Sequence, residues 1–126
     1  MSSYVLDASA LLALLNNEPG ADVVQAALTD DTCYMSTVNW SEVAKKLLDR
    51  KLAVEPVAQT LKGLGLEFID FNYDRAIATA QIQAPALSLG DRACLALAQS
   101  LGAVALSADR IWQTLALDIN IQIIRP

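Results

Sequence analysis

Four carboxylates occupy positions where an α/β protein would place reactive side chains. Asp7 directly follows an apolar run, and Asp109 comes two residues after Ser107, which ends another such run. Asp91 and Glu42 fall in the first turns of predicted helices. Carboxylates gathered within a few ångströms repel one another unless one is protonated or a cation lies between them. Because oxygen ligands without histidine or thiolate favour Mg²⁺ or Mn²⁺ over zinc, convergence of the four would predict a site for a hard divalent cation.

Each acid also has a purely structural interpretation. Asp7 and Asp109 could cap the helices predicted to begin at the next residue, since a side-chain oxygen there accepts a backbone hydrogen bond. Asp91 has the spacing of a capping box with Ser88, and Glu42 has the same spacing from Asn39, which could therefore cap its own helix. Acids are favoured at helix starts in any case, so no single one of them identifies a site.

Helical periodicity separates Asp91 from Glu42. Asp91 is in line with Leu95, so it heads an apolar stripe and is predicted to point inward, where an unpartnered carboxylate is costly. Glu42 precedes Lys46 by four residues, the order that favours a surface ion pair, and Asp49 continues the same face. Periodicity alone therefore predicts that Glu42 lies in solvent.

Short apolar runs alternate with helical stretches, and these elements must position the acids. Strands are predicted over 4–6, 33–36, 67–71, 103–107 and 119–124. Helices are predicted over 8–16, 21–28, 39–52, 55–64, 74–83, 89–101 and 110–115. Strands separated by helices imply an α/β fold whose parallel sheet is covered on both faces. Such sheets bind ligands at the carboxyl ends of their strands, where strand order reverses, and that end is where the four acids are expected to meet.

The composition narrows the class of protein. The chain has 126 residues, enough for one compact domain, and 54% of them are hydrophobic and 18% charged, which excludes a disordered chain. Nine basic residues against fourteen acidic ones give a net charge of −5, unlike that of a nucleic-acid coat protein. The absence of histidine excludes Ser-His-Asp hydrolysis and histidine-ligated zinc. Cys33 and Cys94 are predicted to be buried thiols of a reducing compartment.

No segment has the pattern of a targeting or membrane-spanning sequence. The first residues lack a basic region, and Asp7 interrupts their apolar run. No run approaches the roughly 18 apolar residues that a membrane span needs. We therefore expect a cytoplasmic protein with no membrane segment.

Four stretches, taken together, resemble a known family. YVLDASALLALLNNEPG, STVNWSEVAKKL, LSLGDRACLALAQSLG and ALSADRIW have the order and spacing of a PIN domain, and they are most similar to VapC-type toxin ribonucleases of bacterial toxin–antitoxin systems. The resemblance implies one PIN domain over 1–126. It also implies a three-layer α/β/α fold around a mostly parallel sheet of four to five strands. The activity it implies is Mg²⁺-dependent (or Mn²⁺-dependent) cleavage of RNA.

The catalytic acids of the family fall on Asp7, Glu42, Asp91 and Asp109. The resemblance implies that Asp7, Asp91 and Asp109 hold the metal ion. Glu42 would complete the site, orient the attacking water or help to hold a second ion. The assignment of Glu42 depends mainly on the family, since periodicity indicates solvent.

Two hydroxyls and two arginines accompany the acids. Ser9 and Ser107 would donate hydrogen bonds to the metal-binding carboxylates, although ordinary cap or turn chemistry explains them as well. The family more often has threonine where Ser107 stands. Arg92 and Arg110 each follow an acid immediately, so they could bind substrate phosphates or remain solvated charges at helix starts.

The resemblance also implies protein partners. An antitoxin segment is expected to dock as a helix in a groove formed by the apolar helices at 39–52 and 55–64. Homodimerisation is expected through other apolar helix faces. A mean hydropathy of +0.35, high for a small monomer, is consistent with such covered surfaces.

Three alternatives remain open at the level of sequence. A phosphoryl-transfer domain with an aspartyl nucleophile would need a second aspartate where Ser9 stands, or a late lysine, and none follows Lys62. A non-catalytic PIN-like binding module would use its acids only as helix caps. A PIN nuclease of RNA processing would keep the chemistry and lack an antitoxin.

Overall fold

The computed structural model describes residues 2–126, which form an α/β fold with five strands and six α-helices. The strands are β1 (Ser3–Leu6), β2 (Thr32–Ser36), β3 (Leu66–Ile69), β4 (Val104–Ser107) and β5 (Ile121–Ile123). The α-helices are α1 (Ala8–Leu15), α2 (Ala21–Asp30), α3 (Thr37–Asp49), α4 (Val54–Gly63), α5 (Tyr73–Ala80) and α6 (Leu89–Leu101). A 3₁₀ helix, η1 (Arg110–Thr114), follows β4.

All strand pairs of the sheet are parallel, in the order β3-β2-β1-β4-β5. Tyr4 of β1 is in register with Cys33 of β2 on one side and with Val104 of β4 on the other. The chain builds outward from β1 through β2 and β3, and then returns to add β4 on the opposite side. Strand order therefore reverses between β1 and β4, where ligands bind in such sheets.

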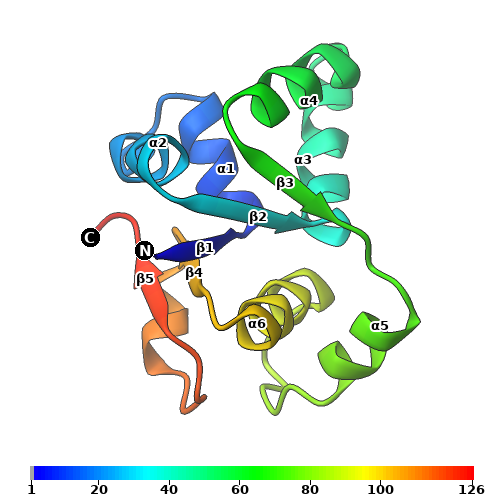
Figure 1. The fold of residues 1–126 in the computed structure, drawn as a ribbon, viewed down its shortest axis with the longest axis vertical. Helices are drawn as coiled ribbons and strands as arrows, with labels where there is room; N and C mark the ends of the chain where they lie inside the picture. The colour runs from blue at the N-terminus through cyan, green and yellow to red at the C-terminus, as the bar shows by residue number, and fades with distance from the viewer. Residues whose placement is uncertain (1) are drawn as a thin grey trace.

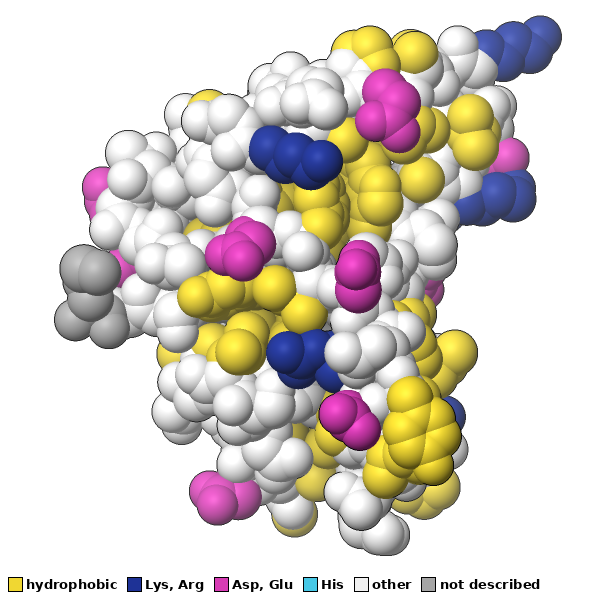
Figure 2. Space-filling view, turned by 45° about the vertical axis from the view of Figure 1, so that its right-hand side comes forward, with side chains coloured by type: hydrophobic (Ala, Val, Ile, Leu, Met, Phe, Trp, Pro, Cys, Tyr) yellow, Lys and Arg dark blue, Asp and Glu magenta, His cyan; other side chains and the backbone are white. Residues whose placement is uncertain are grey.

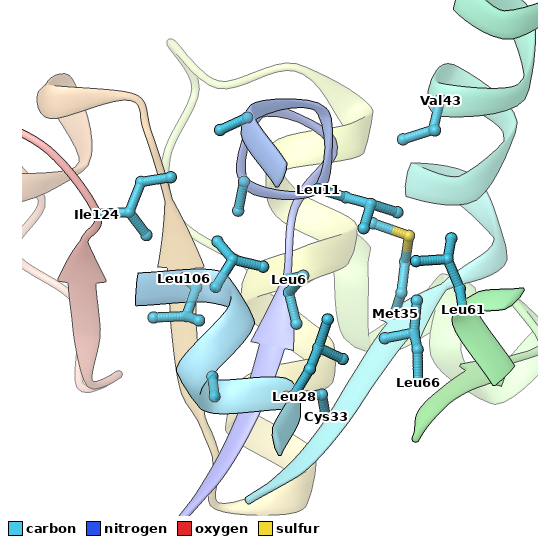
Figure 3. Close-up of a cluster of buried hydrophobic side chains, with 14 of the residues drawn as sticks. Leu6, Leu11, Leu28, Cys33, Met35, Val43, Leu61, Leu66, Leu106 and Ile124 are labelled. Atoms are coloured by element: carbon cyan, nitrogen blue, oxygen red, sulfur yellow. The ribbon is translucent and has the colours of Figure 1, made fainter. Parts of the chain in front are cut away.

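Helices cover both faces of the sheet, which gives three layers (Figure 1). Side chains alternate along the strands, so Leu6, Met35 and Leu106 enter the cluster beneath α1 to α4, which Figure 3 shows. Val5 and Ala105, from the opposite face, pack in a second cluster with α6. The predicted three-layer α/β/α fold and its parallel sheet are confirmed.

The predicted elements are all present, and their ends differ by a few residues. The largest difference at the site is in α3, which begins at Thr37 rather than at 39, because the Ser36 hydroxyl accepts the Val38 amide at 3.2 Å and caps the helix. Its predicted end at 52 is also wrong, since Lys51 has a φ of 59° and leaves the helix. The helix predicted over 74–83 ends at Ala80.

Two further predictions concern burial and membranes. Cys33 and Cys94 are buried free thiols, as expected. Between residues 2 and 126, no helix combines the length and the apolar character that a bilayer span requires.

Candidate metal site at the carboxyl end of the sheet

A hollow of about 180 Å³ opens at the carboxyl ends of β1 and β4. All four predicted acids line it. Its lining residues are Asp7, Ala8, Ser9, Asn39, Glu42, Asp91 and Asp109. They come from the starts of α1, α3 and α6 and from the β4–η1 junction, so the parallel topology gathers side chains that are far apart in the chain.

Asp7 is the most buried of the four acids, with 4% of its surface exposed. Its Oδ1 accepts hydrogen bonds from the Ser9 hydroxyl at 2.7 Å and the Ala10 amide at 2.8 Å, and its Oδ2 accepts the Ser107 hydroxyl at 2.6 Å. Burial raises the pKa of Asp7 to about 6, and nearby Asp91 adds to the rise, whereas the three hydrogen bonds oppose it. Asp7 therefore caps α1, and its burial disfavours the charged form of its carboxyl group.

The two serines connect the ends of β1 and β4. Their hydroxyl oxygens are 3.3 Å apart. Ser9 Oγ also accepts the Ala108 amide at 2.9 Å, and Ser107 Oγ accepts the Asp109 amide at 3.0 Å. Both hydroxyls therefore donate to Asp7, and they also serve in ordinary turn chemistry.

Asp91 and Asp109 both cap helices, as their structural interpretation predicts. Asp91 forms a capping box with Ser88, in which its Oδ2 accepts the Ser88 amide at 3.4 Å. Asp109 Oδ1 accepts the Ile111 amide at 3.1 Å. In each acid the remaining oxygen has no hydrogen-bond donor among residues 2–126. Capping one oxygen orients the carboxylate and leaves the other available to a ligand.

Glu42 is exposed, as periodicity predicts, yet it also lines the hollow, as the family resemblance implies. Its Oε1 accepts a hydrogen bond from Asn39 Nδ2 at 3.2 Å. The carboxylate lies directly against Gly90, where an added Cβ would stand 2.5 Å from Oε1. The face of α3 that carries Glu42 borders the start of α6, so an exposed position can still belong to the site.

Asn39 is the residue of the hollow that sequence reasoning missed. It had only the spacing of a helix cap, and because Ser36 caps α3 this interpretation is wrong. Asn39 is instead 1% exposed and stands in line with Val43 and Leu47, the buried residues of its helix. A polar residue at the head of an apolar stripe was the signal that could have identified it, as it did for Asp91.

The two predicted phosphate-binding arginines do not line the hollow. Arg110 is exposed and Arg92 half-buried, and within the described part of the chain neither forms an ion pair. Basic and acidic side chains are interspersed over the face shown in Figure 2, with apolar ones between them. No extended basic surface covers this face.

The residues of the hollow fit a hard divalent cation in their chemistry. Every side chain that lines the hollow carries oxygen atoms, except that of Ala8, and Asn39 also carries an amide nitrogen. Among residues 2–126, no basic side chain forms an ion pair with the four acids. Asn39 Oδ1 is buried without a hydrogen-bond partner. Within the same part of the chain, no three acidic or cysteine side chains form a ready-made ligand set.

A second, apolar groove of about 460 Å³ lies at the carboxyl-terminal end of α1, between α2 and α4. It is lined by Leu14, Leu15, Gln25, Leu28, Thr29, Pro56, Val57, Thr60, Leu61 and Leu64. An adjoining hollow of about 470 Å³ lies between the two segments predicted to form the docking groove, since Leu47, Arg50 and Leu52 line it together with Val57 of α4. Val43 and Leu47 of α3 also belong to the core cluster.

Comparison with known proteins gives one family and several structures. The sequence model of the PIN domain matches residues 4–117. A toxin–antitoxin complex from Klebsiella pneumoniae has a chain with a TM-score of 0.77 and 17% identity, covering 96% of this chain and 97% of that one. DNA-bound VapBC from Salmonella typhimurium gives a TM-score of 0.72 and 20% identity, covering 98% and 99%. No curated protein sequence matches the chain. At these identities, the structural likeness is one of fold.

Proposed function

The chain belongs to the PIN domain family, and from that premise we propose that it is a divalent-metal-dependent endoribonuclease, the toxin of a toxin–antitoxin pair. One observation carries the proposal: four carboxylates from separate elements line a single hollow at the β1–β4 switch point, without a basic partner among residues 2–126. Helix capping alone explains each acid separately. It does not explain why all four face the same hollow.

In the proposed site, Asp7, Asp91 and Asp109 hold one Mg²⁺ or Mn²⁺ ion. When bound, such an ion supplies charge stabilisation for the phosphodiester transition state and lowers the pKa of a bound water. Ser9, Ser107 and the Ala10 amide fix the orientation of Asp7 and favour its ionised form through their three hydrogen bonds.

Glu42 and the arginines have the remaining roles. Glu42 lies at the rim of the hollow, where it would accept a proton from the attacking water or complete the metal site. Arg92 and Arg110 directly follow Asp91 and Asp109 in the chain, and we propose that they bind phosphates of the RNA backbone. Through these two arginines, a few local contacts would hold the RNA backbone.

We also propose that an antitoxin segment binds the apolar groove between α1, α2 and α4. Several chains of similar fold come from toxin–antitoxin complexes. The groove is lined mainly by leucine, valine and proline side chains and is large enough for the apolar face of a helix.

The exposed Tyr73 and Ile77 of α5 lie outside this groove. We propose that they form a homodimer contact, which light scattering would test.

The test is cleavage of total RNA by the purified, antitoxin-free chain with Mg²⁺ or with EDTA. Asp91→Asn removes one proposed ligand. Asp30→Asn is the matched control, since Asp30 lines a hollow beside Tyr4, at the amino end of the sheet. We expect new RNA 5′ ends only with Mg²⁺, their loss in Asp91→Asn and their retention in Asp30→Asn. Equal RNA patterns in all samples would refute the proposed nuclease activity. Cleavage that is insensitive to EDTA would refute its dependence on a metal ion.

A further inference from the structure

Asn39 is a buried carboxamide between two helices that carry site acids. It lies in the first turn of α3, and its side chain reaches the first turn of α6. Nδ2 donates to the Gly90 carbonyl at 2.9 Å and to Glu42 Oε1 at 3.2 Å. One amide group thus joins the backbone of α6 to the carboxylate of α3.

The contacts determine the orientation of the carboxamide. Both neighbours of Nδ2 are oxygen acceptors, so turning the group by 180° would place Oδ1 against the Gly90 carbonyl and Glu42. In the observed orientation, Oδ1 is buried without a partner. An unpaired buried acceptor costs free energy, and nothing in the packing of α3 requires a polar group there.

The bond to Gly90 is not needed to satisfy the α6 backbone. Gly90 lies inside α6, where its carbonyl is placed to accept the amide four residues later. A nonpolar side chain of similar size would therefore leave no backbone group of α6 unsatisfied. The bond that only Asn39 supplies is the one to Glu42, whose carboxylate is the group packed against Gly90.

We propose that Asn39 is a positioning residue, which uses its Gly90-anchored amide to hold the Glu42 carboxylate over the hollow. This inference rests on the proposed function. The hydrogen bond fixes the direction of the carboxylate, and the anchor removes rotamer freedom that an exposed glutamate otherwise has. Asn39 acts through Glu42 and stays outside the group of acids that would contact the metal ion.

The test is a double-mutant cycle of Asn39→Leu and Glu42→Gln, with Thr79→Val as a control for removing a buried polar group in the other helical layer. The readouts are Mg²⁺ affinity by calorimetry, kcat and KM for RNA cleavage, and urea unfolding in EDTA. Loss of a group that orients a metal ligand typically costs about 10-fold to 100-fold in metal affinity or activity. We expect a loss of about 10-fold for Asn39→Leu in kcat or Mg²⁺ affinity, with KM and the unfolding midpoint preserved.

The cycle separates positioning from structure. In the Glu42→Gln background, Asn39→Leu should cause no further loss of kcat or Mg²⁺ affinity. Additive losses in the double variant would overturn the inference. Wild-type kcat and Mg²⁺ affinity in Asn39→Leu would also overturn it. If Asn39→Leu fails to fold, Asn39→Asp, which keeps the size and removes the donors, replaces it in the cycle. A wild-type chain that neither binds Mg²⁺ nor cleaves RNA would refute the proposed function, and the inference with it. Failure of the inference alone leaves wild-type cleavage intact.

Discussion

Replacing Asp7 with asparagine should make the protein more stable and inactive. Asp7 is buried, and its pKa is raised from 3.8 to about 6, so its ionisation at neutral pH opposes folding. Asparagine is as good a helix cap and can still accept the Ala10 amide through its oxygen. The substitution therefore removes a disfavoured charge and keeps the cap.

The size of the stabilisation expected for Asp7→Asn follows from the shift in the pKa of Asp7. Each pKa unit corresponds to about 1.4 kcal/mol, so a rise of about two units is worth about 3 kcal/mol when the carboxyl is fully ionised in both states. The asparagine amide must in turn donate to Ser107 Oγ, whose hydroxyl has to rotate, which costs about 1 kcal/mol. We expect Asp7→Asn to gain about 2 kcal/mol of unfolding free energy at pH 7.5.

The pH dependence gives the sharper assay. A carboxyl with a raised folded-state pKa favours folding below pH 3.8, and that contribution is lost as the pH rises through about 6. The advantage of Asp7→Asn in urea unfolding with EDTA should therefore be small at pH 4 and complete by pH 7. With Mg²⁺, the wild-type chain should regain stability and the variant should not. Equal stability at pH 7.5, or a difference that does not vary with pH, would refute the reasoning.

The other predictions concern three separate features. Gly90→Ala would place a Cβ 2.5 Å from Glu42 Oε1, so RNA cleavage should fall about 10-fold while circular dichroism stays unchanged; wild-type kinetics would contradict this. Ser107→Ala removes the 2.6 Å hydrogen bond to the buried Asp7 carboxylate and should lower the free energy of unfolding in urea at pH 7.5 by about 1 to 2 kcal/mol. An unchanged urea midpoint would contradict a stabilising role for this hydrogen bond. Leu64→Asp puts a charge in the apolar groove and should weaken antitoxin binding in calorimetry about 10-fold or more, with the exposed Leu48→Asp as control; equal binding would exclude the groove.

The fold was predictable because its signals are local and agree with one another. Apolar runs such as 4–6 and 103–107, each followed by an acid and a helix, specify strands, their parallel arrangement and the edge where ligands bind. The helix at 89–101 was predicted with its correct ends, because Ser88 starts it with a capping box and Gly102 ends it with a φ of 62°.

The parts that were missed depend on contacts between distant segments. Nothing near Asn39 in the chain shows that it meets Gly90, 51 residues later, so the start of α3 was set two residues late and its polar side chain was taken for a cap. An apolar helix face in a sequence does not reveal whether the core or a partner covers it, and Val43 turned out to be committed to the core.

The bond between Ser107 and Asp7, residues 100 apart in the chain, sets a limit on when the site can exist during synthesis. A ribosome releases the segments of α1, α3 and α6 before β4, and until β4 has paired with β1 the hollow lacks one of its walls and Asp109. The unfinished polypeptide therefore lacks the complete site, and even a late premature stop before residue 104 removes one wall of the hollow and Asp109. The proposed nuclease site can form only once nearly all of the chain has left the exit tunnel.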